Sequence, residues 1–288
     1  GMSEYEVALN DRGLAFGDGL FETLFVHRGT PVALAEHLTR LRVGLARLGL
    51  PQPASERVLG AIDSAVGDEA ATGVCKLIVT AGVGPRGYRR PDEPALTVRA
   101  TFGPVPAIPR EPLSVDLSPV TLTGTSTLRG LKHLNRLEQV LAQQSLPRGC
   151  GEALMRDPVG RVVSGTMGNL FWRERGRWHT PALSDGAIAG TRRAWLIEAL
   201  DARIIPCGMG RLALADAAFL SNAVSAWRPI VRLLGRELRA HEPPTDGLRP
   251  LDGCWQPQGG ENVAPWPVSL SAARSRTAWG RVARRDQS

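Results

Sequence analysis

The spacing of apolar residues in the first third of the chain predicts alternating helices and strands. Leucines recur at steps of three and four, which predicts an amphipathic helix over 34–48 built on Leu34, Leu38, Leu41, Leu45 and Leu48. A second helix is expected over 55–66. Runs rich in apolar and β-prone side chains predict strands at 20–28, 74–81 and 95–102.

The following part of the chain is richer in predicted strands. A strand is expected over 113–122, followed by a Gly/Ser/Thr-rich loop. The next segment predicts a helix after Lys132 whose apolar face consists of Leu134, Leu137, Val140 and Leu141. Turn-forming residues at 158–160 predict a hairpin, and the last clear elements are a helix over 191–200 and a buried strand over 217–223.

A proline-rich segment marks the best domain boundary. Residues 104–112 contain several prolines, which exclude a helix or a central strand. We therefore expect a small α/β domain at 1–103, a linker at 104–112 and a larger domain at 113–250. The tail at 251–288 loses its periodicity, and we expect it to be partly disordered.

The net charge of +7 changes this picture little, because the basic residues are spread along the chain and aromatic residues make up only 5%. We therefore expect no nucleic-acid partner. No apolar run is long enough for a membrane span, and the N-terminus lacks a signal-peptide pattern, so a cytoplasmic protein is expected without a membrane partner. Cysteines and histidines are scattered, which argues against a metal site.

The use of lysine is the strongest chemical signal. Of the 35 basic residues, only Lys76 and Lys132 are lysines. An arginine stays protonated, whereas a lysine can lose its proton and act as a nucleophile or base. Lys132 lies between a loop and a predicted helix, a position that suits a catalytic amine. Lys76 lies inside an apolar run, where an edge or outward-facing strand position is the simplest interpretation.

Six motifs extend this signal into a family resemblance. They are DRGLAFGDGLFETL (11–24), EHLTRL (36–41), LKHLNRLEQVLA (131–142), GNLFW (168–172), AGTRR (189–193) and FLSNAVSAWRPI (219–230). Their order resembles that of the fold-type IV pyridoxal-phosphate enzymes, which include the branched-chain and D-amino-acid aminotransferases. The resemblance implies two α/β domains, a small N-terminal one and a larger barrel-like one, with pyridoxal 5'-phosphate as cofactor. It also implies a homodimer.

The resemblance assigns cofactor-binding roles to individual residues. It implies that Lys132 holds pyridoxal phosphate covalently and then transfers protons. Arg40 corresponds to the arginine that binds the cofactor phosphate, and a guanidinium fork suits that anion. Further contacts to the phosphate are implied for the helix N-terminus at Thr191 and Arg192, and for the loop at Asn222 and Ala223.

One position departs from the wider family. Ser164 stands where those enzymes carry a glutamate that keeps the pyridine nitrogen protonated. A serine hydroxyl can form a hydrogen bond to that nitrogen but holds its charge less well. Amino transfer depends strongly on this charge, whereas an elimination that forms an aromatic ring needs it less. Ser164 therefore favours a lyase as a hypothesis.

The form of the Lys132 motif, with RGY at 86–88, most resembles the 4-amino-4-deoxychorismate lyases. These enzymes release 4-aminobenzoate, a folate precursor, and pyruvate. The resemblance implies Thr23 as the proton donor to the leaving group, and Arg86, Tyr88 and Arg136 are candidates for binding the substrate. Two alternatives remain open: a branched-chain or D-amino-acid aminotransferase, and a catalytically inactive relative that acts as a binding protein.

Overall fold

The computed structural model describes residues 6–68, 71–106, 112–225, 227–239, 248–251 and 254–257. The chain divides into two compact units. Unit 1 comprises Gly1–Val105 and Leu131–Asn135, and unit 2 comprises Pro106–Gly130 and Arg136–Ser288. The short segment Leu131–Asn135 thus groups with unit 1, although it lies inside the range expected for the larger domain. Its backbone hydrogen bonds to unit 1, described below, are the reason.

Unit 1 contains an antiparallel sheet with the strand order β2-β1-β3-β4. The strands are β1 (Gly19–His27), β2 (Thr30–Pro31), β3 (Gly73–Thr80) and β4 (Thr97–Gly103). The helices are α1 (Arg12–Phe16), α2 (Leu34–Arg47) and α3 (Ser55–Val66). The helices and strands predicted for this part of the chain are confirmed within a few residues.

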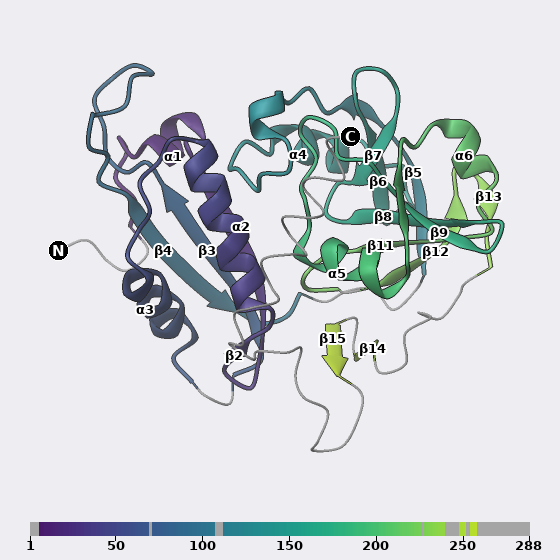
Figure 1. Cartoon of the computed structure of the whole chain (residues 1–288), viewed down its shortest axis with the longest axis horizontal. Coiled ribbons are helices and arrows are strands. Elements are labelled where there is room, and N and C mark those ends of the chain that lie inside the picture. The colour runs from purple at the N-terminus through teal and green to yellow at the C-terminus, as the bar shows by residue number, and fades with distance from the viewer. Residues whose placement is uncertain are drawn as a thin grey trace. The chain divides into compact units, whose positions relative to one another are not determined.

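One face of this sheet is apolar at its centre and is packed against helices, and the other face is more polar. On one face, Leu20 and Leu24 of β1 are buried, and Gly44 of α2 packs so closely that a Cβ there would lie 2.6 Å from Leu20. Helices α2 and α3 contact the sheet and lie on one side of it in Figure 1. Alternate residues point to the opposite face. We call it the Phe21 face, and its central residues are Phe21, Thr23, Lys76, Ile78, Arg99 and Thr101.

Unit 2 is built on a curled nine-stranded sheet with the order β10-β9-β8-β11-β12-β5-β6-β7, in which β13 also pairs with β12. The strands are β5 (Leu113–Thr121), β6 (Glu152–Arg156), β7 (Val162–Gly165), β8 (Asn169–Glu174), β9 (Arg177–Pro181), β10 (Arg203–Ile205), β11 (Ala217–Ser221), β12 (Arg228–Leu233) and β13 (Arg236–Glu237). The helices are η1 (Ser126–Leu128), α4 (Leu137–Gln144), α5 (Thr191–Ala199) and α6 (Met209–Ala213). The predicted hairpin, β6–β7, is confirmed. Phe171, Phe219 and Trp227 stack in the core.

Helix α4 corrects one expectation. The helix begins at Leu137 and not directly after Lys132, because residues 132–134 pair with β1. Its apolar positions are not packed into the core of this chain. Leu137 is 67% exposed, Val140 51% and Leu141 49%. The helical period was therefore correct, but the apolar face is directed to the surface of the chain.

The C-terminal part is described only in part. Strands β14 (Leu248–Leu251) and β15 (Cys254–Pro257) form a small antiparallel hairpin. The rest of the expected disordered tail lies outside the described residues.

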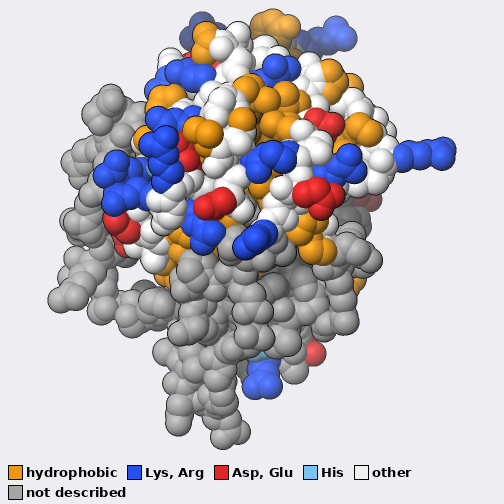
Figure 2. Space-filling view, turned by 90° about the vertical axis from the view of Figure 1, so that its right-hand side faces the viewer, with side chains coloured by type: hydrophobic (Ala, Val, Ile, Leu, Met, Phe, Trp, Pro, Cys, Tyr) orange, Lys and Arg blue, Asp and Glu red, His pale blue; other side chains and the backbone are white. Residues whose placement is uncertain are grey.

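Within the described part of the chain, no helix has the length and hydropathy of a membrane span. On the face drawn in Figure 2, Lys and Arg side chains are interspersed with Asp and Glu.

Candidate active site

Lys132 is held along the edge of β1. The amide of Phe21 donates to the Lys132 carbonyl at 2.9 Å, and the amide of Leu134 donates to the Gly19 carbonyl at 3.0 Å. Leu20 pairs with His133 on one side and with β3 on the other. The segment therefore extends the sheet and fixes the base of the Lys132 side chain. Its Nζ lies 4.2 Å from the centroid of the Phe21 ring.

Thr23 lies two residues from Phe21, on the same face of β1. Its partner across the β1–β3 pair is Lys76, whose Nζ lies 5.2 Å from the Phe21 ring. Strand β3 lies between β1 and β4. Of the two positions expected for Lys76, an edge or an outward-facing strand position, the outward-facing one is confirmed by its exposure.

Arg40 lies on the opposite side of the sheet, in a buried ion pair. Its Nε donates to Glu22 Oε1 at 2.8 Å, and its Nη2 donates to Oε2. The Nδ1 of His37 lies 2.6 Å from Glu22 Oε2. Burial by itself would raise the pKa of Glu22, but Arg40 and His37 outweigh it and lower the pKa to about 2. This network sets the direction of the Arg40 guanidinium.

His37 is also close enough to Lys132 to be affected by its charge. Burial is the main cause that lowers the pKa of His37, and the positive charges of Arg40 and Lys132 lower it further, against the opposing effect of Glu22. The charge of Lys132 therefore has a small effect at His37, beside Glu22.

Within unit 1, the loop that carries Arg86 and Tyr88 is held in place by the buried side chain of Arg12. The guanidinium of Arg12 donates to the Gly87 carbonyl at 3.1 Å and to the Tyr88 carbonyl at 2.7 Å. Arg12 also donates to Asp18, which accepts hydrogen bonds from Arg90 as well. Burial would raise the pKa of Asp18, but Arg90 and Arg12 lower it. The loop backbone is thus fixed while the Arg86 and Tyr88 side chains are exposed.

In unit 2, the motifs around Ser164, Thr191 and Asn222 come together. Ser164 is buried at the end of β7. A loop follows Ser164 and ends at Asn169, the first residue of β8. The side chain of Asn169 donates to the carbonyl of Ile188 at 3.0 Å, just before the AGTRR segment. Asn222 donates to the Met167 carbonyl at 3.3 Å. These contacts link three segments that are far apart in sequence.

A buried carboxylate supports the loop after Ser164. Glu152 of β6 accepts hydrogen bonds from the Thr166 amide at 3.0 Å and from the Gln143 side chain at 3.1 Å. Burial raises the pKa of Glu152 in spite of these bonds. Glu152 therefore stabilises the loop between Ser164 and Asn169.

Helix α5 presents its first turn to this group of loops. Its N-cap is Gly190, which has no side chain to cap that turn, and a Cβ there would lie 2.1 Å from Asn169 Oδ1. Thr191 and Arg192 are buried, and burial lowers the pKa of Arg192 to about 9. An adjacent anion would stabilise the charged guanidinium. The helix N-terminus attracts anions as well.

Asn222 and Arg136 have clear structural contacts. The Oδ1 of Asn222 accepts hydrogen bonds from the amides of Val224 and Ser225, at 2.9 and 2.8 Å, so this side chain organises its own loop. Ala223 leaves only its backbone for a ligand. Arg136 is the N-cap residue of α4 and has a weak contact, 3.4 Å, to the Gly186 carbonyl. The cofactor contact expected for Asn222 and the substrate contact expected for Arg136 stay predictions.

Taken separately, each unit offers groups that suit a part of pyridoxal phosphate. Unit 1 offers a fixed amine at Lys132 and an oriented guanidinium at Arg40. Unit 2 offers a glycine-capped helix N-terminus with the buried cation Arg192. The amine of Lys132 suits the aldehyde of the cofactor. The guanidinium groups and the helix N-terminus suit its phosphate.

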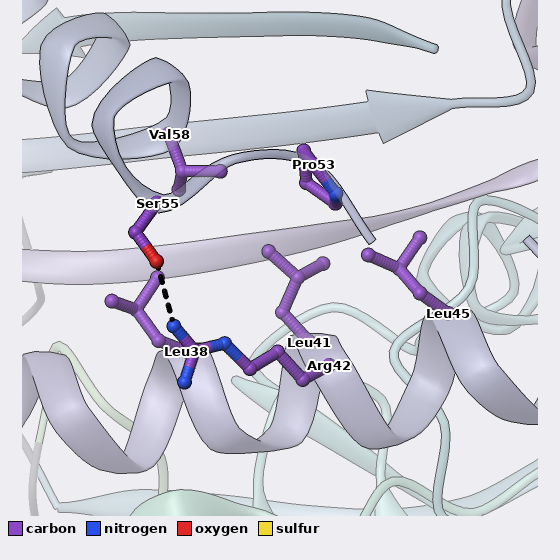
Figure 3. A pocket seen from close by; sticks show the side chains of 7 residues that line it. All are labelled: Leu38, Leu41, Arg42, Leu45, Pro53, Ser55 and Val58. Carbon is purple, nitrogen blue, oxygen red and sulfur yellow. Dashed lines mark hydrogen bonds between the residues drawn. The ribbon is translucent and has the colours of Figure 1, made fainter. Parts of the chain in front are cut away.

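The hollow in Figure 3 lies elsewhere in unit 1. It is lined by Leu38, Leu41, Arg42, Leu45, Pro53, Ser55 and Val58. Arg42 Nη2 donates to Ser55 Oγ at 3.0 Å across it. Its lining comes from α2, from Pro53 before α3 and from the first turns of α3, and both helices lie on the other side of the sheet from the Phe21 face. It is a packing gap between elements, without a titratable group positioned for catalysis.

Sequence reasoning missed several residues near these sites. Glu22 and His37 lie inside the quoted motifs, in FETL and EHLTRL, but their pairing across strand and helix is not visible from spacing. Glu152 and the convergence of Lys76 on Phe21 were also missed. The one available signal was the rarity of lysine, which applies equally to Lys76.

Comparison with known proteins gives matches over most of the chain. The family model for amino-transferase class IV matches residues 19–233. Aminodeoxychorismate lyase of Vibrio harveyi is 27% identical over 263 residues, covering 88% of this chain and 97% of that protein. A putative branched-chain-amino-acid aminotransferase of Methanocaldococcus jannaschii is 28% identical, covering 80% of this chain and 84% of that protein.

A solved structure resembles the chain more strongly. The structure of 4-amino-4-deoxychorismate lyase from Pseudomonas aeruginosa is 39% identical in sequence and has a TM-score of 0.75. The match covers 82% of this chain and 91% of that one. The two-unit α/β architecture expected from the motifs is thereby confirmed.

Proposed function

The chain belongs to the class IV aminotransferase family, whose enzymes use pyridoxal phosphate, and we propose that it is a lyase that converts 4-amino-4-deoxychorismate to 4-aminobenzoate and pyruvate. The observation that carries the proposal is the fixed amine of Lys132 beside Phe21, on the sheet face that also bears Thr23. The likeness to the Pseudomonas aeruginosa lyase supports the choice within the family.

Lys132 supplies the amine that the chemistry needs. Its primary amine could hold the aldehyde of the cofactor covalently, which the guanidinium of an arginine could not do. When bound, pyridoxal phosphate holds the amino group of the substrate and withdraws electrons from the adjacent carbon. Lys132 would hold the cofactor through its amine, and as a free amine it would accept the proton from C4 of the substrate.

Thr23 is the proposed acid. As the C4–H bond breaks, its electron pair forms a ring double bond and the C3–O bond to the enolpyruvyl group breaks. The hydroxyl of Thr23 donates a proton to the departing oxygen, and the enol then becomes pyruvate. Loss of the C4 proton and of the C3 oxygen leaves an aromatic ring, which drives the elimination.

Ser164 supports the lyase over the aminotransferase. Because the product ring is aromatic, elimination depends less on a permanently protonated pyridine nitrogen than amino transfer does. A buried hydroxyl at Ser164 provides a hydrogen-bonding group without a negative charge. This is the feature of the chain that favours one branch of the family over the other.

The central experiment measures pyruvate release from aminodeoxychorismate by the wild type and by Lys132→Ala. The wild type is expected to be active, and the variant to lose activity together with the visible absorbance of lysine-bound cofactor. Equal activity of both proteins would refute the role of Lys132. Formation of pyridoxamine phosphate with an amino acid, but no pyruvate release, would instead indicate an aminotransferase. A colourless wild-type protein without bound cofactor would favour the inactive relative.

We also propose that the protein acts as a homodimer. The exposed apolar positions Leu137, Val140 and Leu141 on α4 support a contact with a second copy. Sedimentation of the wild type and of the double variant Leu137→Glu/Val140→Glu tests this, with Val159→Glu, an equally exposed apolar position on a turn, as the control. The double variant is expected to sediment as a monomer and the control as a dimer. A monomeric wild type would contradict the proposal.

A further inference from the structure

The two lysines of the chain converge on one aromatic ring. Lys132 Nζ lies 4.2 Å and Lys76 Nζ 5.2 Å from the centroid of the Phe21 ring. Lys132 approaches from the segment on one side of β1, and Lys76 comes from β3 on the other side. The two nitrogens are therefore no further apart than the sum of these distances.

The surroundings of Lys76 are cationic. The strand residues that share the central part of the Phe21 face include Arg99 but no aspartate or glutamate. Within the described part of the chain, Lys76 makes no ion pair with an acidic side chain, and its side chain is exposed. Two ammonium groups close to one ring repel each other, and an anion bound between or beside them removes that repulsion.

The identity of the residue suits this purpose. Of the Lys and Arg residues of the chain, all except Lys76 and Lys132 are arginines. A lysine is a compact point charge with three donors, which binds a carboxylate without the planar fork of arginine. The ammonium of Lys76 also lies over the Phe21 ring, beside which the amine of Lys132 lies as well.

We propose that Lys76 binds a carboxylate of the substrate whose amino group reacts at Lys132. This inference rests on the proposed function and names the recognition group for a dicarboxylate substrate. Thr23 lies directly opposite Lys76 in the β1–β3 pair, on the face that also bears Phe21. A substrate anchored by Lys76 at one carboxylate therefore presents its leaving group to the proposed acid.

The test uses the holoenzyme and the variants Lys76→Gln and Lys76→Arg. Arg47→Gln is the matched control, because it removes one exposed positive charge from α2, which covers the other side of the sheet. The first measurement is the steady-state rate of pyruvate release. Lys76→Gln is expected to raise KM about tenfold with a smaller change in kcat, a loss typical of a charged hydrogen bond. Lys76→Arg is expected to recover part of this loss.

The second measurement does not depend on turnover. Chorismate has both carboxylates but a hydroxyl in place of the reacting amino group, so it binds without reacting. Titration calorimetry is expected to give about tenfold weaker chorismate binding for Lys76→Gln, and unchanged binding for Arg47→Gln.

Each outcome decides the assignment. Normal chorismate binding and KM in Lys76→Gln would overturn it while leaving the lyase function intact. Equal losses in Lys76→Gln and Arg47→Gln would reduce the effect to net charge and would also overturn it. A wild type that releases no pyruvate would overturn the proposed function, and the role of Lys76 with it.

Discussion

Glu22 on β1 and Arg40 on α2 form a buried, two-point ion pair, with 2.8 Å between Arg40 Nε and Glu22 Oε1. The pair joins the central strand of unit 1 to the helix that covers it. It also fixes the guanidinium proposed to bind the cofactor phosphate. A single carboxylate thus has consequences for both stability and cofactor binding.

Replacement of Glu22 tests both consequences. Glu22→Gln leaves Arg40 buried without its counter-charge, and we expect a loss of about 3 kcal/mol in the free energy of unfolding at neutral pH. Chemical denaturation measures this loss. The affinity for pyridoxal phosphate is expected to fall while that for pyridoxal, which lacks the phosphate, changes little. Equal losses for both ligands would contradict the orienting role.

The same pair predicts a pH dependence of stability. The pKa of Glu22 is lowered to about 2 from its ordinary value of 4.5, so the folded protein binds this proton less readily than the unfolded chain. The stabilisation is complete above pH 4.5 and is lost as the pH falls towards 2. The wild type should therefore lose more stability than Glu22→Gln over this window, as measured by denaturation at successive pH values.

Replacement of Thr23 tests the proposed acid. Thr23→Ala removes the hydroxyl and is expected to lower kcat for pyruvate release about a hundredfold. Thr23→Ser keeps the hydroxyl and should retain much of the rate. Cofactor absorbance serves as the control, because neither change touches Lys132. Full activity in Thr23→Ala would assign proton donation to another group.

Introducing a carboxylate at Ser164 tests the difference between elimination and amino transfer. Ser164→Glu is expected to leave the lyase rate unchanged or lower it, because elimination does not need a stronger electron sink. Ser164→Ala is the companion variant that removes the hydroxyl without adding charge. Both rates are followed by pyruvate release. A large gain in Ser164→Glu would show that the strong sink was limiting.

The Arg12–Asp18–Arg90 network predicts a protease-resistant loop. In Asp18→Asn the two arginines lose their shared carboxylate, and the backbone of residues 86–90 should become more mobile. Limited trypsin digestion, read by mass spectrometry, is expected to cut faster after Arg86 and Arg89 than in the wild type. An unchanged cleavage rate would mean that Arg12 fixes the loop through its carbonyl contacts alone.

Local sequence determined much of the secondary structure. The helices at α2, α3 and α5 and the strands β1, β3 and β4 follow from side-chain periodicity, because that period reflects which side of each element is buried. Lys132 was identifiable for a different reason. In a chain that uses arginine almost everywhere, a lysine next to recognisable motifs is a strong chemical signal.

Tertiary structure decided the relationships between distant residues. Periodicity indicated that the α4 face is apolar, but only the fold shows that Leu137 is exposed. Spacing could not pair Glu22 with Arg40, or bring Lys76 and Lys132 to Phe21, because strand register and helix packing set these contacts. The sequence by itself indicated the amine that we propose carries the chemistry, Lys132. The fold decided which side chains surround that amine, since those neighbours come from segments separated by more than fifty residues.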